Sequence, residues 1–113
     1  MNQTNRINEM HQEAMELAWE ADRAKKHGNE AEAQALYRRA LVLETQAADE
    51  VPFGIEPSRS ILYRSAATLA LDCGLGQEAE QLANTGLMGT PPTDIAAELH
   101  EVIERARKRE PQK

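Results

Sequence analysis

The side chains that could carry catalytic or metal chemistry are few, and they lie far apart along the chain. The histidines, His11, His27 and His100, fall in three separate segments, and none has a cysteine or another histidine at the spacing of a zinc site. His100 and Glu104 share one face of a predicted helix, as residues of a solvated acidic helix commonly do. The sequence therefore predicts no metal site and no cofactor.

The hydroxyl and thiol groups do not stand in a context that would make them nucleophiles. Ser58, Ser60 and Ser65 have no histidine nearby in the sequence. Cys73 lies at the carboxyl end of a predicted helix, where the helix dipole raises the pKa of a thiol and disfavours the reactive thiolate. The glycines on either side of Leu75 lack the lysine and the preceding strand of a phosphate-binding loop. We therefore predict that the protein is not an enzyme.

The composition favours a small helical protein that binds neither nucleic acid nor a membrane. The 113 residues suit one domain, alanine is frequent, and only 4% of the residues are aromatic. A net charge of −6 argues against nucleic acid. The basic run 105–109 is typical of a helix end, with phosphate binding as the alternative. No apolar run reaches the ~20 residues of a membrane span, and residues 1–6 are too polar for a signal peptide. We expect a cytoplasmic protein.

Apolar residues recur at spacings of three and four in five segments, which is the pattern of amphipathic helices. Glycines and prolines separate these segments at Gly28, 51–57, Gly74 and 89–92. After the first turn, Asn29 and Glu32 have the spacing of a capping box. The sequence predicts a single all-α domain over residues 1–113. Its parts are a first helix pair at 5–50, a proline loop at 51–57, a second helix pair at 58–89 and a capping helix at 91–109.

The two predicted helix pairs share one pattern of small residues around their turns. Ala21, Gly28, Ala33 and Ala40 in the first pair have the same spacing as Ala67, Gly74, Ala79 and Gly86 in the second. Together with Tyr37 and Pro91, these residues resemble the tetratricopeptide repeat, a pair of antiparallel helices that stacks on its copies. Glu20, Ala24 and Thr45 depart from that pattern, and the units are offset by more than the usual 34 residues. The resemblance implies an antiparallel helix-hairpin array of two units, followed by the capping helix.

A second resemblance covers a shorter part of the chain. The stretches EPSRSILYRSAATLALDCG, at 56–74, and GTPPTDIAAEL, at 89–99, look like a signature of small bacterial tetratricopeptide-like proteins. This resemblance implies a bacterial origin and the same fold, and it carries no biochemical mechanism.

In such an array the first helix of each pair lines a concave groove. The resemblance places in this groove Met15, Ala18, Trp19, Asp22 and Lys26 from the first pair, and Ile61, Arg64, Thr68, Leu71 and Asp72 from the second. Arg59 completes the predicted partner-binding surface. Tryptophan and arginine often anchor interfaces, although Trp19 could instead pack in the core. The predicted function is an adaptor that holds a peptide or helix of a partner protein; the alternative is a structural module that forms a homodimer.

The charges of the third predicted helix need partners if that helix is central, because an unpaired buried charge is costly. Arg64 and Asp72 lie ~12 Å apart along the helix axis, too far to pair with each other. We expect Asp22 to pair with Arg64, Lys26 with Asp72, and Glu56 or a loop carbonyl with Arg59. Arg59, Arg64 and Asp72 would then form a polar cluster that is either structural or in contact with a ligand.

Overall fold

The computed structural model describes residues 3–109, and it places five α-helices and no strand in that range. Their bounds are α1 Gln3–Lys26, α2 Glu30–Glu50, α3 Ser58–Asp72, α4 Gly76–Leu87 and α5 Thr93–Arg109. The predicted all-α class with five helices is therefore confirmed. Residues 1–2 and 110–113 of the predicted domain 1–113 lie outside the described part.

Three helix boundaries differ from the prediction. Helix α1 begins at Gln3 rather than at residue 5, α4 ends at Leu87 rather than at residue 89, and α5 begins at Thr93 rather than at residue 91. Pro91 stands directly before Pro92, and a residue before proline is pushed out of the helical conformation. The helix consequently starts after the second proline, where the Ala96 amide donates to the Pro92 carbonyl at 2.8 Å.

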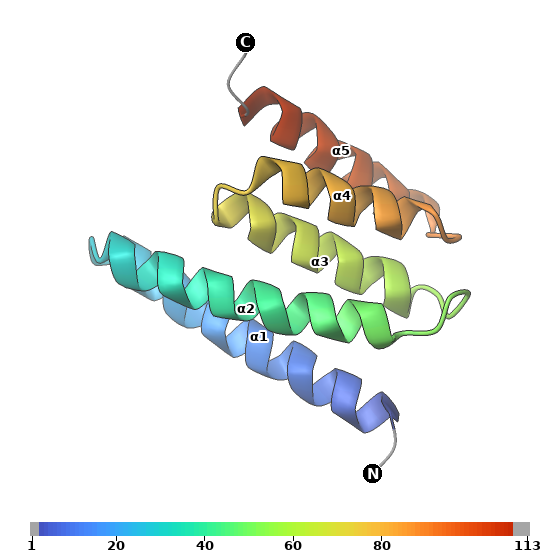
Figure 1. The fold of residues 1–113 in the computed structure, drawn as a ribbon, viewed down its shortest axis with the longest axis horizontal. Helices are drawn as coiled ribbons and strands as arrows, with labels where there is room; N and C mark the ends of the chain where they lie inside the picture. The colour runs from blue at the N-terminus through green and yellow to red at the C-terminus, as the bar shows by residue number, and fades with distance from the viewer. Residues whose placement is uncertain (1–2, 110–113) are drawn as a thin grey trace.

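The helices run in alternating directions and stack from α1 at one end of the molecule to α5 at the other (Figure 1). Each helix packs on the next one in the sequence, and α3 also packs on α5. The molecule measures 40 × 39 × 21 Å, and its short dimension is that of two helix layers of about 10 Å each. The central helix α3 thus contacts α2, α4 and α5.

Small residues lie where the helices touch, as their spacing predicts. Ala21, Ala33, Ala40, Ala67 and Ala79 are fully buried. Gly86 is buried as well, and a Cβ atom at that position would lie 3.0 Å from the Cβ of Tyr63 and 3.2 Å from Leu99. These small residues allow α4 and its neighbours to approach more closely than larger side chains would permit.

The two turns within the helix pairs are the same structural motif. Gly28 and Gly74 both have positive φ angles, 81° and 74°. In the first turn the Gly28 amide donates to the Lys25 carbonyl and the Asn29 amide to the Ala24 carbonyl; in the second, Gly74 donates to Leu71 and Leu75 to Ala70. Both sets of hydrogen bonds form a Schellman motif at the helix carboxyl end. The predicted capping box is wrong, because the Asn29 side chain makes no capping hydrogen bond to α2.

Replacing either glycine by alanine should cost about 1 kcal/mol of unfolding free energy, because an L-residue with a Cβ is strained at positive φ. The two losses should be similar, since neither Cβ would meet another atom within 4 Å. Urea unfolding of Gly28→Ala and Gly74→Ala measures both losses. Asparagine tolerates this conformation better, so Gly28→Asn and Gly74→Asn should lose less. Unequal losses, or an equal loss with asparagine, would contradict this account.

Candidate functional site

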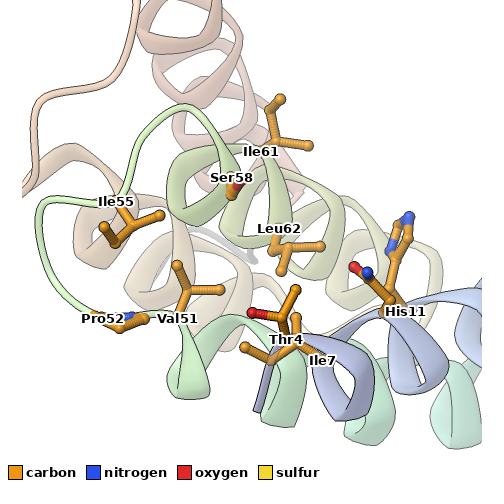
Figure 2. Close-up of a pocket in the computed structure, with 10 residues that line it drawn as sticks. Thr4, Ile7, His11, Val51, Pro52, Ile55, Ser58, Ile61 and Leu62 are labelled. Carbon is orange, nitrogen blue, oxygen red and sulfur yellow. The ribbon is translucent and has the colours of Figure 1, made fainter. Parts of the chain in front are cut away.

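A pocket of about 290 Å³ opens between the first half of α1, the proline loop and the first turns of α3 (Figure 2). Its lining consists of Thr4, Ile7, Asn8 and His11 from α1, Val51, Pro52 and Ile55 from the loop, and Ser58, Ile61 and Leu62 from α3. Five of these ten residues have branched aliphatic side chains, and His11 is the one ionisable side chain of the lining. Such a pocket suits an uncharged aliphatic group.

Helical spacing and a loop turn bring these residues together. Thr4, Asn8 and His11 lie on one face of α1, while Ser58 and Leu62 are one turn apart on α3. Between them, the Ile55 amide donates to the Pro52 carbonyl at 3.1 Å, and this turn closes the loop above the pocket. Val51 is buried, whereas Ile55 stays 53% exposed at the rim.

A buried polar group lies directly behind the pocket. Both carboxylate oxygens of Glu44, on α2, lie within 2.8–2.9 Å of His11 Nδ1. Ser65, on α3, also makes a side-chain hydrogen bond to Glu44. Glu44 is fully buried, and burial raises the pKa of its carboxyl group, while the hydrogen bonds from Ser65 and His11 act in the opposite direction. One carboxylate thus connects α1, α2 and α3.

This arrangement differs from that of a nucleophilic triad. In a triad the serine bonds to the histidine, and the carboxylate holds the far side of the imidazole ring. Here Ser65 and His11 both bond to the same carboxylate, Glu44. The three side chains therefore form a buried connection between helices and do not prepare Ser65 for attack on a substrate.

The predicted groove residues of α1 lie on the helix face that carries the pocket, one to four turns further along. Met15 is half-buried, and Asp22 and Lys26 are exposed. Trp19 is 60% exposed, and the Arg23 guanidinium stacks 4.9 Å from the centre of its ring. The alternative that Trp19 packs in the core is therefore wrong.

On α3 the predicted pairing of Arg64 with Asp22 is wrong. Arg64 Nη1 instead bonds to Glu98 Oε1 of α5 at 2.6 Å, and Asp22 accepts a hydrogen bond from the Tyr37 hydroxyl. Arg64 points toward α5 because α5, not α1, packs closely on that side of α3. Of the other predicted residues on α3, Thr68 is half-buried, Asp72 is exposed and Leu71 is buried, so Leu71 does not line a surface.

Arg59 does not belong to an exposed binding surface, contrary to the prediction. It is only 6% exposed, and its guanidinium stacks 4.9 Å from the ring centres of both Phe53 and Tyr63. Its Nη2 donates to the Thr85 carbonyl of α4 at 3.1 Å. Arg59 therefore joins the proline loop to the end of α4. Because it points toward α4 and Arg64 toward α5, the predicted cluster of Arg59, Arg64 and Asp72 does not form.

The expected partner of Arg59, Glu56, has another role. Its Oε1 accepts a hydrogen bond from the Ser60 amide at 3.1 Å and its Oε2 one from the Thr90 amide at 3.3 Å. Glu56 thus caps the start of α3 and holds the turn between α4 and α5.

The sequence contained signals for the pocket and for Glu44 that the prediction missed. The groove stripe that begins at Met15 continues upstream at helical spacing through His11, Asn8 and Thr4. Glu44 interrupts the apolar stripe of α2, between Leu41 and Ala48. A charged residue on a buried stripe indicates a partner inside the protein. Only the fold shows that this partner is His11.

Comparisons with protein-family models, with curated proteins and with solved structures find no match to this chain. Among residues 3–109, no helix is both long and apolar enough to cross a membrane. The same residues contain no group of three or more His, Cys, Asp or Glu side chains that could hold a metal ion.

Proposed function

We propose that the protein is an adaptor that binds a peptide or helix of another protein on the face formed by α1 and α3. The observation that carries this proposal is the aliphatic pocket between α1, the proline loop and α3. Interfaces obtain most of their binding energy from a few apolar anchors that enter such pockets. Trp19, which is 60% exposed on the same helix face, offers a second anchor point further along α1.

The proposed relation to tetratricopeptide repeats supports this function. The equivalent turns at Gly28 and Gly74, and the buried small residues around them, are what two copies of one helix-pair unit would contain. Stacked units of this kind present the first helix of each pair on one surface, where partners bind. On the resemblance of residues 56–74 and 89–99 we propose a bacterial origin. On the composition and on the context of the reactive side chains we propose a cytoplasmic setting and a role without catalysis.

The alternative, a homodimer through the open end of the array, has less support. One side of α1 carries a row of exposed glutamates, Glu9, Glu13, Glu16 and Glu20. A symmetric dimer through this side would bring two such rows together, and like charges in contact are unfavourable. The row instead suits the polar end face that a helical array needs for solubility.

Site-specific photo-cross-linking in cells that naturally produce the protein tests the proposal. A photoreactive residue replaces Ser58, which is exposed at the pocket rim, or, as the matched control, Val42, which is exposed on α2. We expect a defined partner to be cross-linked from position 58 and not from position 42. Equal labelling from both positions would contradict the proposal, and cross-links only between copies of the chain would favour the homodimer.

A further inference from the structure

The first half of α1 buries little of its own surface. The buried residues of this helix all follow His11, and they are Ala14, Leu17, Ala21 and Ala24. Among residues 3–13 none is buried, and Ile7 and Met10 are only partly covered by the core. Helical segments with few buried apolar contacts open more readily than the core does. The position of the segment Gln3–His11 therefore depends strongly on its polar contacts.

Polar contacts join this segment to α2 both at the surface and in the interior. At the surface, Gln3 Nε2 donates to the Glu50 carbonyl at 2.8 Å, and Arg6 lies 3.1 Å from the Glu50 carboxylate. Such contacts contribute little to stability because water competes for both partners. In the interior, His11 Nδ1 lies 2.8 Å from Glu44, which is fully buried. The contact with Glu44 is thus the one that water does not weaken.

The same carboxyl group is also bonded to α3. Ser65 of α3 makes a side-chain hydrogen bond to Glu44, so Glu44 is linked to both helices that line the pocket. Backbone packing does not fix the distance between these two helices, since α1 packs on α2 while α3 packs on α2, α4 and α5. Ile7 of α1 and Ile61 of α3 line the pocket between them (Figure 2). A change at Glu44 therefore acts on the width of the pocket.

The charge state of Glu44 depends on a titratable neighbour and not on a permanent cation. Within residues 3–109, the side chains that act on its carboxyl group are His11 from α1 and Ser65 from α3. The arginines of α3 point elsewhere, Arg59 to α4 and Arg64 to α5. Once His11 is neutral, an ionised Glu44 keeps hydrogen bonds but has no compensating charge. A buried carboxylate in that state is costly, and exposure to water relieves the cost.

We propose that Glu44 is a pH-dependent latch of the pocket: with its proton it holds the segment Gln3–His11 closed against α3, and ionisation releases the segment and widens the pocket. Burial raises the pKa of the Glu44 carboxyl, so the closed form binds the proton more tightly than an opened, hydrated form does. Closure is therefore strongest below the ordinary pKa of 4.5 and weakens as pH rises through the raised pKa. This inference rests on the proposed function, because it regulates access to the same pocket.

Amide hydrogen exchange of the full-length chain, followed by NMR from about pH 4 to about pH 9, tests the latch. Protection factors, which correct for the intrinsic pH dependence of exchange, are measured for Met10 and His11 and compared with those for Leu17 and Ala21. The ratio of the first pair to the second cancels changes in global stability. We expect this ratio to fall at least about tenfold as pH rises, because the stranded carboxylate favours local opening.

Two variants show whether Glu44 is responsible. Glu44→Gln keeps the donor and the acceptor of the protonated carboxyl group and cannot ionise, so its protection ratio should stay constant with pH. Glu50→Gln is the matched control, because it removes another α2 carboxylate that contacts the same segment, through Arg6. This variant should keep the pH dependence of the wild type. In the wild type, the Glu44 carboxyl ¹³C resonance and the Ile7 and Ile61 methyl resonances should shift with the midpoint of the opening.

A constant protection ratio in the wild type, or a ratio that still falls with pH in Glu44→Gln, would overturn the inference. A midpoint of opening that differs from that of the Glu44 resonance would overturn it as well. These measurements need no partner, so their failure leaves the adaptor function intact. Cross-linking from position 58 decides that function separately, and its failure beside a pH-dependent opening would leave the latch as a property of the fold alone.

Discussion

His11→Ala should destabilise the protein by about 3 kcal/mol at neutral pH, although His11 is partly exposed to water. The physical reason lies in its partner, because the substitution leaves the fully buried Glu44 carboxyl group without its hydrogen bond to His11. Glu44→Gln should cost less, about 1 kcal/mol, since an amide oxygen can still accept from His11 Nδ1–H. Substitution of His11, the more exposed residue of the pair, is thus expected to destabilise the protein more than substitution of Glu44. Urea unfolding of both variants measures this difference.

The loss of unfolding free energy in His11→Ala should also depend on pH, and the burial of Glu44 determines the direction of this dependence. Burial raises the pKa of the Glu44 carboxyl above its ordinary value, so the folded state holds its proton more tightly than the unfolded chain does. Stability therefore falls as pH rises from the unfolded pKa, near 4.5, through the raised folded pKa. Without His11 the folded pKa rises further, so the loss should be small near pH 4 and largest at neutral pH.

His100→Ala is the control for the effect of losing an imidazole, because His100 is exposed and should change stability by less than about 0.5 kcal/mol. The double variant His11→Ala/Glu44→Gln should recover much of the loss, since no buried charge remains. If His11→Ala changed stability as little as His100→Ala, or if its loss of stability were independent of pH, burial of Glu44 would not require the hydrogen bond to His11.

Ile61→Glu should weaken binding of the partner identified by cross-linking at least about tenfold, because it places a charge where the aliphatic anchor must enter. Ile61 lines the pocket and is half-buried, so the variant can be checked for folding by its melting temperature. Calorimetric titration of the purified partner measures the change. The matched control is Val42→Glu, which adds the same charge at an exposed position on α2 outside this pocket.

A further variant, Trp19→Ala, distinguishes a single pocket from a longer binding face. If the partner also lies along α1 as predicted, loss of the exposed indole should weaken binding by more than about 1 kcal/mol. A wild-type affinity in Trp19→Ala would limit the site to the pocket end. Equal weakening by Ile61→Glu and Val42→Glu would show that the effect is one of net charge, and it would exclude the pocket as the binding site.

Much of the fold could be predicted because its signals are local. The period of the apolar residues specifies each helix, and the turns at Gly28 and Gly74 have a positive φ, which glycine adopts without strain. The buried alanines Ala21 and Ala67 were recognisable because they occupy equivalent positions in two segments with the same spacing of small residues. The turn between α4 and α5 is longer than expected, because α4 already ends at Leu87 and α5 begins only after Pro92.

The pairing of charges was not predictable in the same way. The periodicity of apolar residues indicates which face of a helix is buried. It does not indicate which neighbouring helix packs on that face, or which residues of the two helices lie opposite each other. Arg64 could therefore be assigned to Asp22 on paper, although packing of α3 on α5 brings it to Glu98. Arg59 could be placed on a surface, although the proline loop and α4 enclose it between Phe53 and Tyr63.

The sequence by itself determined the five helices, their two equivalent turns and the face of α1 and α3 that the proposed function uses. The tertiary structure decided where that face becomes a pocket, because α1, the loop and α3 meet only in the folded chain. It also decided that Glu44 and His11, 33 residues apart, form a hydrogen bond next to the pocket. A buried carboxylate must find a cation or stay neutral, and only the packing of three helices determines which side chain is near enough to serve it.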